Sequence, residues 1–159
     1  PIPNENFAKN RMPTKHELHG FAMRLFDAAK DELIRDGNVM SKHVLMKQDS
    51  IYVYLVEAGV DKDVMARQLK AVAPACKAVG STFETWMVMG YPEINVRPSA
   101  HPSRVEAIVV SVQSKDGSWF LTSKFDCDAS TGKPNSPSSP EASWSDDASI
   151  EGRYANLYA

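Results

Sequence analysis

The chain has 159 residues, a formal net charge of −2 and 24% charged side chains. This length suits one domain with extensions, and it is enough to bury a core without disulfides. The balanced charge disfavours a nucleic-acid partner, which usually requires a basic face, and no apolar run reaches the ~20 residues of a membrane span. No cofactor is predicted. Since residues 1–10 lack the apolar core of a secretory signal, we expect a cytoplasmic or virion protein with Cys76 and Cys127 as free thiols, a disulfide being the alternative.

Residues 1–13 are polar and are predicted to form an extended arm, after which an amphipathic helix begins. Thr14 and Glu17 have the spacing of a capping box, in which each side chain accepts from an amide at the helix start. Apolar residues then recur at intervals of three and four, which indicates one buried face. Gly37 is predicted to end the helix in the left-handed conformation.

Two β-like segments follow, at residues 42–47 and 50–57, with Gln48 and Asp49 between them as the turn. Both faces of the second segment are apolar, which predicts a strand inside the sheet. A second helix is expected over residues 61–80, with Asp61 as its N-cap, Gly80 at its end and Pro74 kinking or splitting it.

Three further strands are predicted at residues 81–89, 104–113 and 118–125, the last two joined by a turn that ends at Gly117. The resulting order is α-β-β-α-β-β-β. It predicts an α+β domain over residues 14–126, with a mostly antiparallel five-stranded sheet and both helices on one face. Residues 127–159 are rich in Ser, Pro and acid. They are predicted to form a flexible tail with an aromatic docking end, which rests on its own domain or on another chain.

A possible metal site is the pair His16 and His19, one helix turn apart. Zinc-enzyme helices use H-E-x-x-H with a third ligand elsewhere, and this chain lacks that pattern. Surface or boundary histidines are the simpler interpretation, so no metal is predicted.

A possible catalytic group consists of Glu84, His101, Arg104 and Glu106. If the third and fourth strands are neighbours, the two carboxylates share a face and His101 could carry protons beside them. The alternative is that both carboxylates form ion pairs with Arg104 or Lys124 on a solvated face. The sequence has no nucleophile elbow, phosphate-binding loop or dinucleotide-binding turn.

Aromatic residues indicate a third kind of site. Tyr52, Tyr54, Trp86 and Trp119 are predicted to project from the sheet face opposite the helices, where aromatic side chains cover an interface or stack on bases. The balanced charge favours an interface. The predicted partner-binding residues are Tyr52, Tyr54, Trp119, Trp144, Tyr154, Leu157 and Tyr158.

The segment Glu84–Met87, followed by "RPSAHPSRVEAIVVSV" and a "KDG" turn, resembles a group of uncharacterised bacterial and phage proteins with an E-x-W strand and a P-S-x-H-P-x-R-x-E core. The resemblance covers about the middle third of the chain and implies no mechanism. The order of elements is also similar to that of roadblock and longin-like modules.

The sequence therefore predicts a non-enzymatic interaction or structural module, virion-associated or host-interacting, that binds a protein partner or forms a homo-oligomer through the sheet face and the tail. Neither nucleic acid nor membrane is expected as a partner. The alternative is a small hydrolase-like or metal-dependent enzyme with the Glu/His/Arg group as its site.

Overall fold

The computed structural model describes residues 2–3, 11–88, 104–146 and 154–158. Helix α1 (Lys15–Asp36) begins at the predicted capping box, in which Thr14 Oγ1 accepts from Glu17 N and Thr14 N donates to the Glu17 carboxylate. Arg11 also bonds this carboxylate, and together these groups lower the pKa of Glu17 to about 2. Gly37 ends the helix with a φ of 80°, as predicted.

Within the described residues the sheet has seven strands, all paired antiparallel, in the order β1-β3-β2-β4-β5-β6-β7. Their bounds are β1 (Ile2–Pro3), β2 (Lys42–Met46), β3 (Ser50–Leu55), β4 (Ala78–Val88), β5 (Arg104–Ser114), β6 (Gly117–Phe125) and β7 (Glu141–Ser145). The predicted α+β class with an antiparallel sheet and two helices is confirmed. β1 and β7 were not predicted, and β7 lies within the Ser-rich segment that was expected to be flexible.

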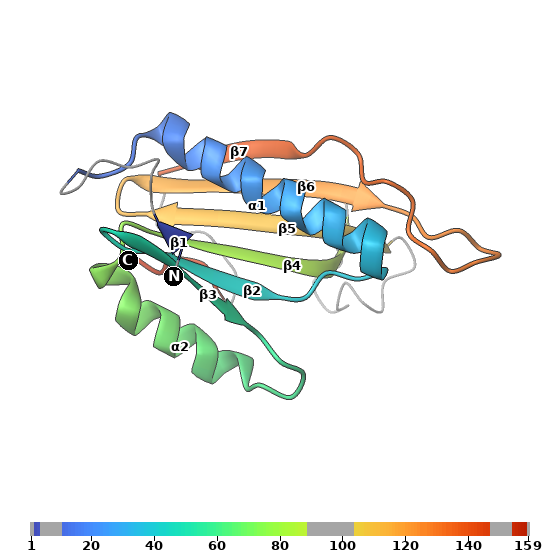
Figure 1. Cartoon of the computed structure of the whole chain (residues 1–159), viewed down its shortest axis with the longest axis horizontal. Helices are drawn as coiled ribbons and strands as arrows, with labels where there is room; N and C mark the ends of the chain where they lie inside the picture. Colours follow the sequence, from blue (N-terminus) through green and yellow to red (C-terminus); the bar gives the residue numbers. More distant parts are fainter. Residues whose placement is uncertain (1, 4–10, 89–103, 147–153, 159) are drawn as a thin grey trace.

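Helix α1 lies across one face of the sheet in Figure 1, in front of β4, β5 and β6. Its buried side chains pack against residues of four strands, among them Met46, Ile108, Val112 and Leu121. Each fully buried side chain of this size stabilises the fold by roughly 2 kcal/mol. The helix and the inner strands therefore form the main core.

Helix α2 (Lys62–Val72) contributes to a second core on the other face. Its buried Leu69 clusters with Leu45 and Val79. The sequence neighbours of those two strand residues, Met46 and Ala78, belong to the α1 core instead. Because successive strand residues point to opposite faces, α1 and α2 cover different faces. The expectation that both helices pack on one face is therefore corrected.

Pro74 explains where α2 ends. The helix stops at Val72, a short 3₁₀ turn covers Ala73–Ala75, and β4 already begins at Ala78. The split predicted from Pro74 is confirmed, since a helix-interior proline removes a hydrogen bond and clashes with the preceding turn. Gly80 is not the helix end that was predicted; it lies inside β4, where Leu25 of α1 occupies the space that a Cβ would need.

The predicted hairpin turn is confirmed at Gly117, which pairs with Ser114 and has a φ of 144°. An added Cβ at this position would lie 2.5 Å from the Trp144 ring and 2.8 Å from the Ser145 carbonyl oxygen. The glycine therefore permits both the turn and the close approach of β7.

We expect Gly117→Ala to lower the free energy of unfolding by about 2 kcal/mol, because it combines an unfavourable φ with a clash against β7. Gly20→Ala is the matched control: its Cβ would meet nothing within 4 Å in α1, so a gain of about 0.5–1 kcal/mol is expected. Urea denaturation of both variants checks this. Equal stability of Gly117→Ala and the wild type would contradict the turn geometry.

Candidate functional site

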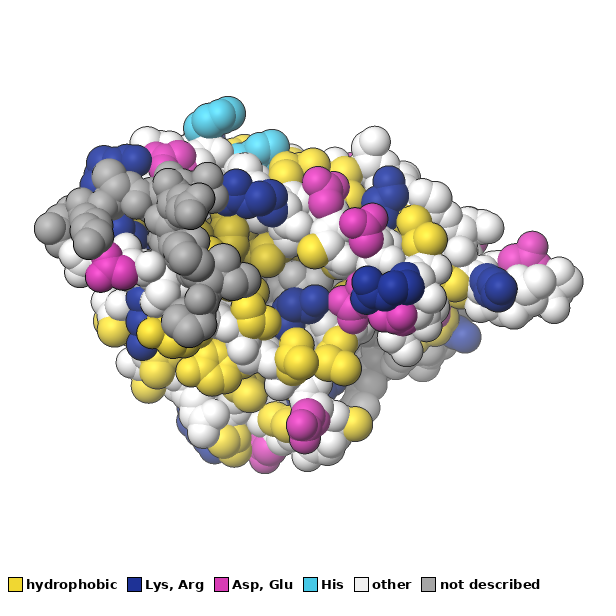
Figure 2. Space-filling view, viewed as in Figure 1, with side chains coloured by type: hydrophobic (Ala, Val, Ile, Leu, Met, Phe, Trp, Pro, Cys, Tyr) yellow, Lys and Arg dark blue, Asp and Glu magenta, His cyan; other side chains and the backbone are white. Residues whose placement is uncertain are grey.

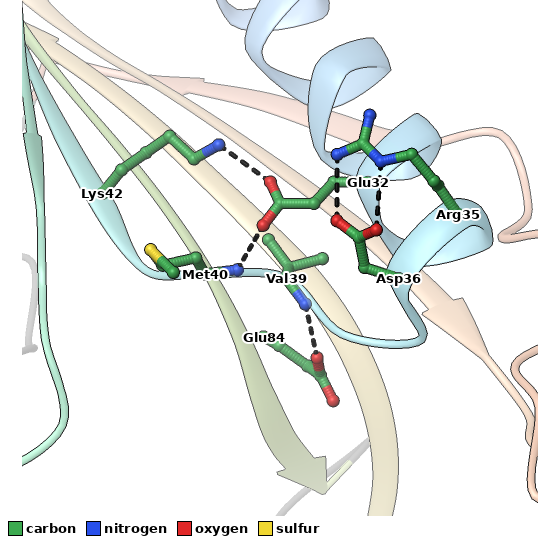
Figure 3. A network of polar contacts seen from close by, with 7 residues as sticks. All are labelled: Glu32, Arg35, Asp36, Val39, Met40, Lys42 and Glu84. Carbon is green, nitrogen blue, oxygen red and sulfur yellow. Dashed lines mark hydrogen bonds and ion pairs between the residues drawn. The ribbon is translucent and has the colours of Figure 1, made fainter.

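The two acidic residues of the predicted catalytic group lie on one face of the sheet, as expected. Glu106 pairs with Trp86 in the β4–β5 register, and Glu84 is two residues from Trp86 along β4. However, Glu84 Oε2 accepts a hydrogen bond of 3.0 Å from the backbone amide of Val39, as Figure 3 shows. This carboxylate therefore holds the connection between α1 and β2.

Glu32 serves the same connection from the helix side (Figure 3). Its carboxylate accepts a hydrogen bond of 2.7 Å from Met40 N and one of 2.9 Å from Lys42 Nζ. Both side chains of the Glu32–Lys42 ion pair are largely buried. The Arg35–Asp36 pair beside them is exposed and contributes little. These acidic groups have partners that fix a backbone turn, which is a structural role.

Of the other two members of the predicted group, Arg104 lies within the described residues and His101 does not. The Arg104 guanidinium lies 4.8 Å from the centre of the Trp86 ring, in a cation–π contact, and His101 lies outside the described residues. The Cys127 thiol donates to Glu106 Oε2 at 3.3 Å. The pKa of this thiol is raised, mainly by desolvation and secondly by the Glu106 carboxylate. A thiol that stays protonated is a poor nucleophile.

We expect Glu84→Ala to lower the free energy of unfolding by about 1–2 kcal/mol, because the Val39 amide loses its partner. Glu84→Gln keeps an acceptor oxygen and should lose less than half as much. Asp36→Ala serves as the exposed control and should change nothing measurable. Chemical denaturation measures the free energy of unfolding of the three variants. A Glu84→Ala protein as stable as the wild type would contradict the structural role of this carboxylate.

The possible metal site at His16 and His19 has no third ligand among the described residues. Within residues 11–88, 104–146 and the other described positions, no group of three or more His, Cys, Asp or Glu side chains is arranged to hold a metal ion. The His19 ring instead packs edge-on against Trp119, with ring centres 4.6 Å apart. His19 therefore has a packing role at the α1–β6 contact.

The tryptophans do not lie where the sequence analysis placed them. Trp119 Nε1 donates to the Lys15 carbonyl oxygen of α1, so Trp119 is on the α1 face, and Trp86 shares that face through the alternation of β4 and β5. Trp144 of β7 packs edge-on against Trp119, with ring centres 5.4 Å apart. Tyr52 and Tyr54 do lie on the opposite face, since they pair with Leu45 and His43.

The aromatic C-terminal residues pack on their own chain. Leu157 is only 3% exposed and belongs to the second core. The Gln113 side chain holds this segment at two points: its Nε2 donates to the Tyr154 carbonyl oxygen and its Oε1 accepts from Leu157 N. The Tyr158 hydroxyl donates to the Cys76 carbonyl oxygen, and burial raises the pKa of Tyr158. These residues cover part of the second face of the sheet.

Strand β3 is the most exposed apolar element. Tyr52, Val53, Tyr54 and Leu55 are 37%, 47%, 51% and 57% exposed. β1 pairs only with Ser50 and Ile51, so among the described residues nothing pairs with the outer edge of β3 beyond Ile51. The strand is therefore close to the sheet edge. The prediction from its two apolar faces, that it lies inside the sheet, is corrected. Figure 2 shows hydrophobic side chains gathered over this side of the sheet.

A cavity of about 420 Å³ opens on the face opposite α1, and the sequence analysis did not predict it. Strands β4, β5 and β6 supply much of its wall through Phe83, Thr85, Val109, Ser111 and Phe120, and Tyr154 and Ala155 of the C-terminal segment add to it. Cavities of this volume are in the range of small-molecule sites.

His43 of β2 lines this cavity and is 1% exposed. Its Nδ1 lies 2.8 Å from Ser81 Oγ, its ring packs edge-on against Tyr154, and its Nε2 is buried without a hydrogen-bond partner in the described part of the chain. Burial lowers the pKa of His43 to about 4, so the ring is neutral at pH 7. A histidine inside the otherwise apolar stretch "HVLM" is the signal that could have identified it.

The depressed pKa of His43 predicts a pH dependence of stability. The unfolded chain takes up a proton near pH 6.5 and the folded chain only near pH 4, so the stabilisation is complete above pH 6.5 and is lost as the pH falls toward 4. The loss is on the order of 3 kcal/mol. His43→Gln should remove this dependence of the free energy of unfolding on pH. The other histidines are present in both proteins, so their contribution cancels in the comparison. Denaturation curves between pH 4 and 7 check it; identical slopes would contradict the assignment.

A scan against protein-family models, a search of curated proteins and a search of solved structures each found no match to this chain. None of the described helices is both long and apolar enough to cross a membrane.

Proposed function

We propose that this chain is a protein-binding module that uses the edge of β3 as its binding surface. The observation that carries the proposal is the run Tyr52–Leu55, four consecutive large apolar residues that are 37% to 57% exposed. Among the described residues, the outer side of this strand is paired only at Ser50 and Ile51. Proteins usually protect such edges with charges, prolines or covering segments, because free backbone groups pair readily with another chain.

The mode of binding that fits this edge is strand addition. The backbone of the incoming strand supplies hydrogen bonds, and the alternating side chains of β3 supply apolar contact on both faces. Tyr52 and Tyr54 lie on the cavity face, and Val53 and Leu55 lie on the α1 face. Ile51 packs against the α1 core, but Val53 and Leu55 do not belong to it. The added strand comes from a second copy of the chain or from another protein.

The C-terminal aromatic residues are left out of this proposal because they pack on their own domain. The enzyme alternative is not carried further, since the carboxylate of Glu84 is bonded to a backbone amide. The resemblance to bacterial and phage proteins supports a virion component or a host protein as the class of partner.

The test compares two double variants. Tyr54→Lys with Leu55→Lys places charge on the β3 edge, whereas Val64→Lys with Val72→Lys places it on apolar residues of α2 that are 37% and 39% exposed. We expect the β3 variant to weaken association about tenfold or more, a change of about 1.4 kcal/mol. The α2 variant should behave as the wild type.

Sedimentation velocity over a concentration series measures self-association, and cross-linked pull-down with each variant as bait measures association with other proteins. Loss of either one in the β3 variant alone supports the proposal and identifies the kind of partner. A wild type that is monomeric and retains no protein, or equal losses in both variants, would contradict it.

A further inference from the structure

The cavity on the face opposite α1 has the composition of a ligand site. Its volume of about 420 Å³ exceeds that of a substituted benzene ring several-fold, and its apolar wall includes Phe83, Val109, Phe120 and Tyr154. Ligand sites of this type are mostly apolar, with a few polar groups that fix orientation.

Most polar side chains that line this cavity are uncharged hydrogen-bonding groups. His43 contributes a buried Nε2 without a partner in the described structure, and Ser41, Thr85 and Ser111 also line the space. A buried polar atom without a partner is costly, so a ligand group that bonds to it gains that energy back. His43 is held neutral by its surroundings and does not by itself select for charge.

Two charged residues also line the cavity, and neither creates an ionic site. The Glu84 carboxylate accepts from Val39 N on the α1 face, so the alternation of β4 turns it away from the cavity. Lys62 is the first residue of helix α2 and is flanked in the chain by Asp61 and Asp63, so these three side chains together carry a net charge of −1. The local charge therefore does not favour an anion.

We propose that this cavity binds a small uncharged molecule with an aromatic or aliphatic body and one hydroxyl or amide group, which hydrogen-bonds to Nε2 of His43. The Tyr154 ring lies 4.7 Å from the His43 ring and forms part of the wall. Because Nε2 is fully buried, the proposal requires a side chain of this wall to move as the polar group reaches the imidazole. The proposal concerns the sheet face under the C-terminal segment and does not depend on pairing at the β3 edge.

The test uses three probes that differ in one substituent: toluene, p-cresol and p-toluate. Backbone amide shifts of Thr85, Ser111 and Phe120 in ¹H–¹⁵N spectra report on the cavity. We expect saturable binding of p-cresol, about fivefold tighter than toluene because of the added hydrogen bond. p-Toluate should bind more weakly than p-cresol, since its carboxylate would leave water for a mostly apolar cavity whose one lining cation, Lys62, lies between two aspartates in the chain.

Three variants keep the proposal falsifiable. Val109→Trp should fill the cavity and abolish binding of all three probes, whereas the equally large change Val53→Trp on β3 should leave binding intact. His43→Phe should bind p-cresol and toluene equally. Shifts confined to β3, binding that survives Val109→Trp, or a wild type that binds toluene as tightly as p-cresol would each overturn the proposal.

Discussion

The approach of α1 to β4 is the contact on which the rest of the structure depends. Gly80 leaves room for Leu25 and Phe21 of the helix, with distances of 2.7 Å and 3.2 Å from the position a Cβ would take. A Cβ at this position would require the Leu25 side chain to shift. Because the helix can lie close, its apolar face reaches the inward side chains of β5 and β6 as well, and the middle of this sheet face is buried.

A single helix covers only one face, so the other face needs separate cover. Helix α2 supplies a small part of it, through one buried leucine, and the C-terminal segment supplies Tyr154, Leu157 and Tyr158. This cover is incomplete: it leaves the cavity beside His43 and leaves β3 exposed. The cavity and the exposed strand β3 therefore have the same physical origin: the elements that pack on the second face and on the β3 edge are too small to cover them.

Local signals predicted the elements whose energetics are local. The capping box at Thr14, the left-handed Gly37, the break at Pro74 and the turn at Gly117 all act through neighbouring backbone groups, and all four are present. The strand β7 was missed because a five-residue Ser-rich strand has little propensity of its own. It is held by its pairing with β6 and by the packing of Trp144 on Trp119, contacts with residues distant in the sequence.

The candidate sites were predicted less well than the elements. Glu84 and Glu106 share a face as expected, yet the sequence could not show that Glu84 bonds to an amide 45 positions away. His43 received no functional prediction, because a lone histidine in a strand acquires an unpaired nitrogen only when strands and C-terminal segment close around it. The exposure of β3 likewise depends on which strand pairs with it, and not on its own apolar pattern.

The sequence by itself determined the α+β class, the antiparallel sheet and most helix and turn boundaries, because capping, periodicity and turn conformation depend on residues a few positions apart. The tertiary structure alone decided that the two helices cover opposite faces, that β3 stands near the edge and that the chain end closes over a cavity. These features depend on the strand order and on which face of each strand packs against the helix. A strand that is apolar on both faces does not specify that face by its own sequence, so the packing of the elements decides it.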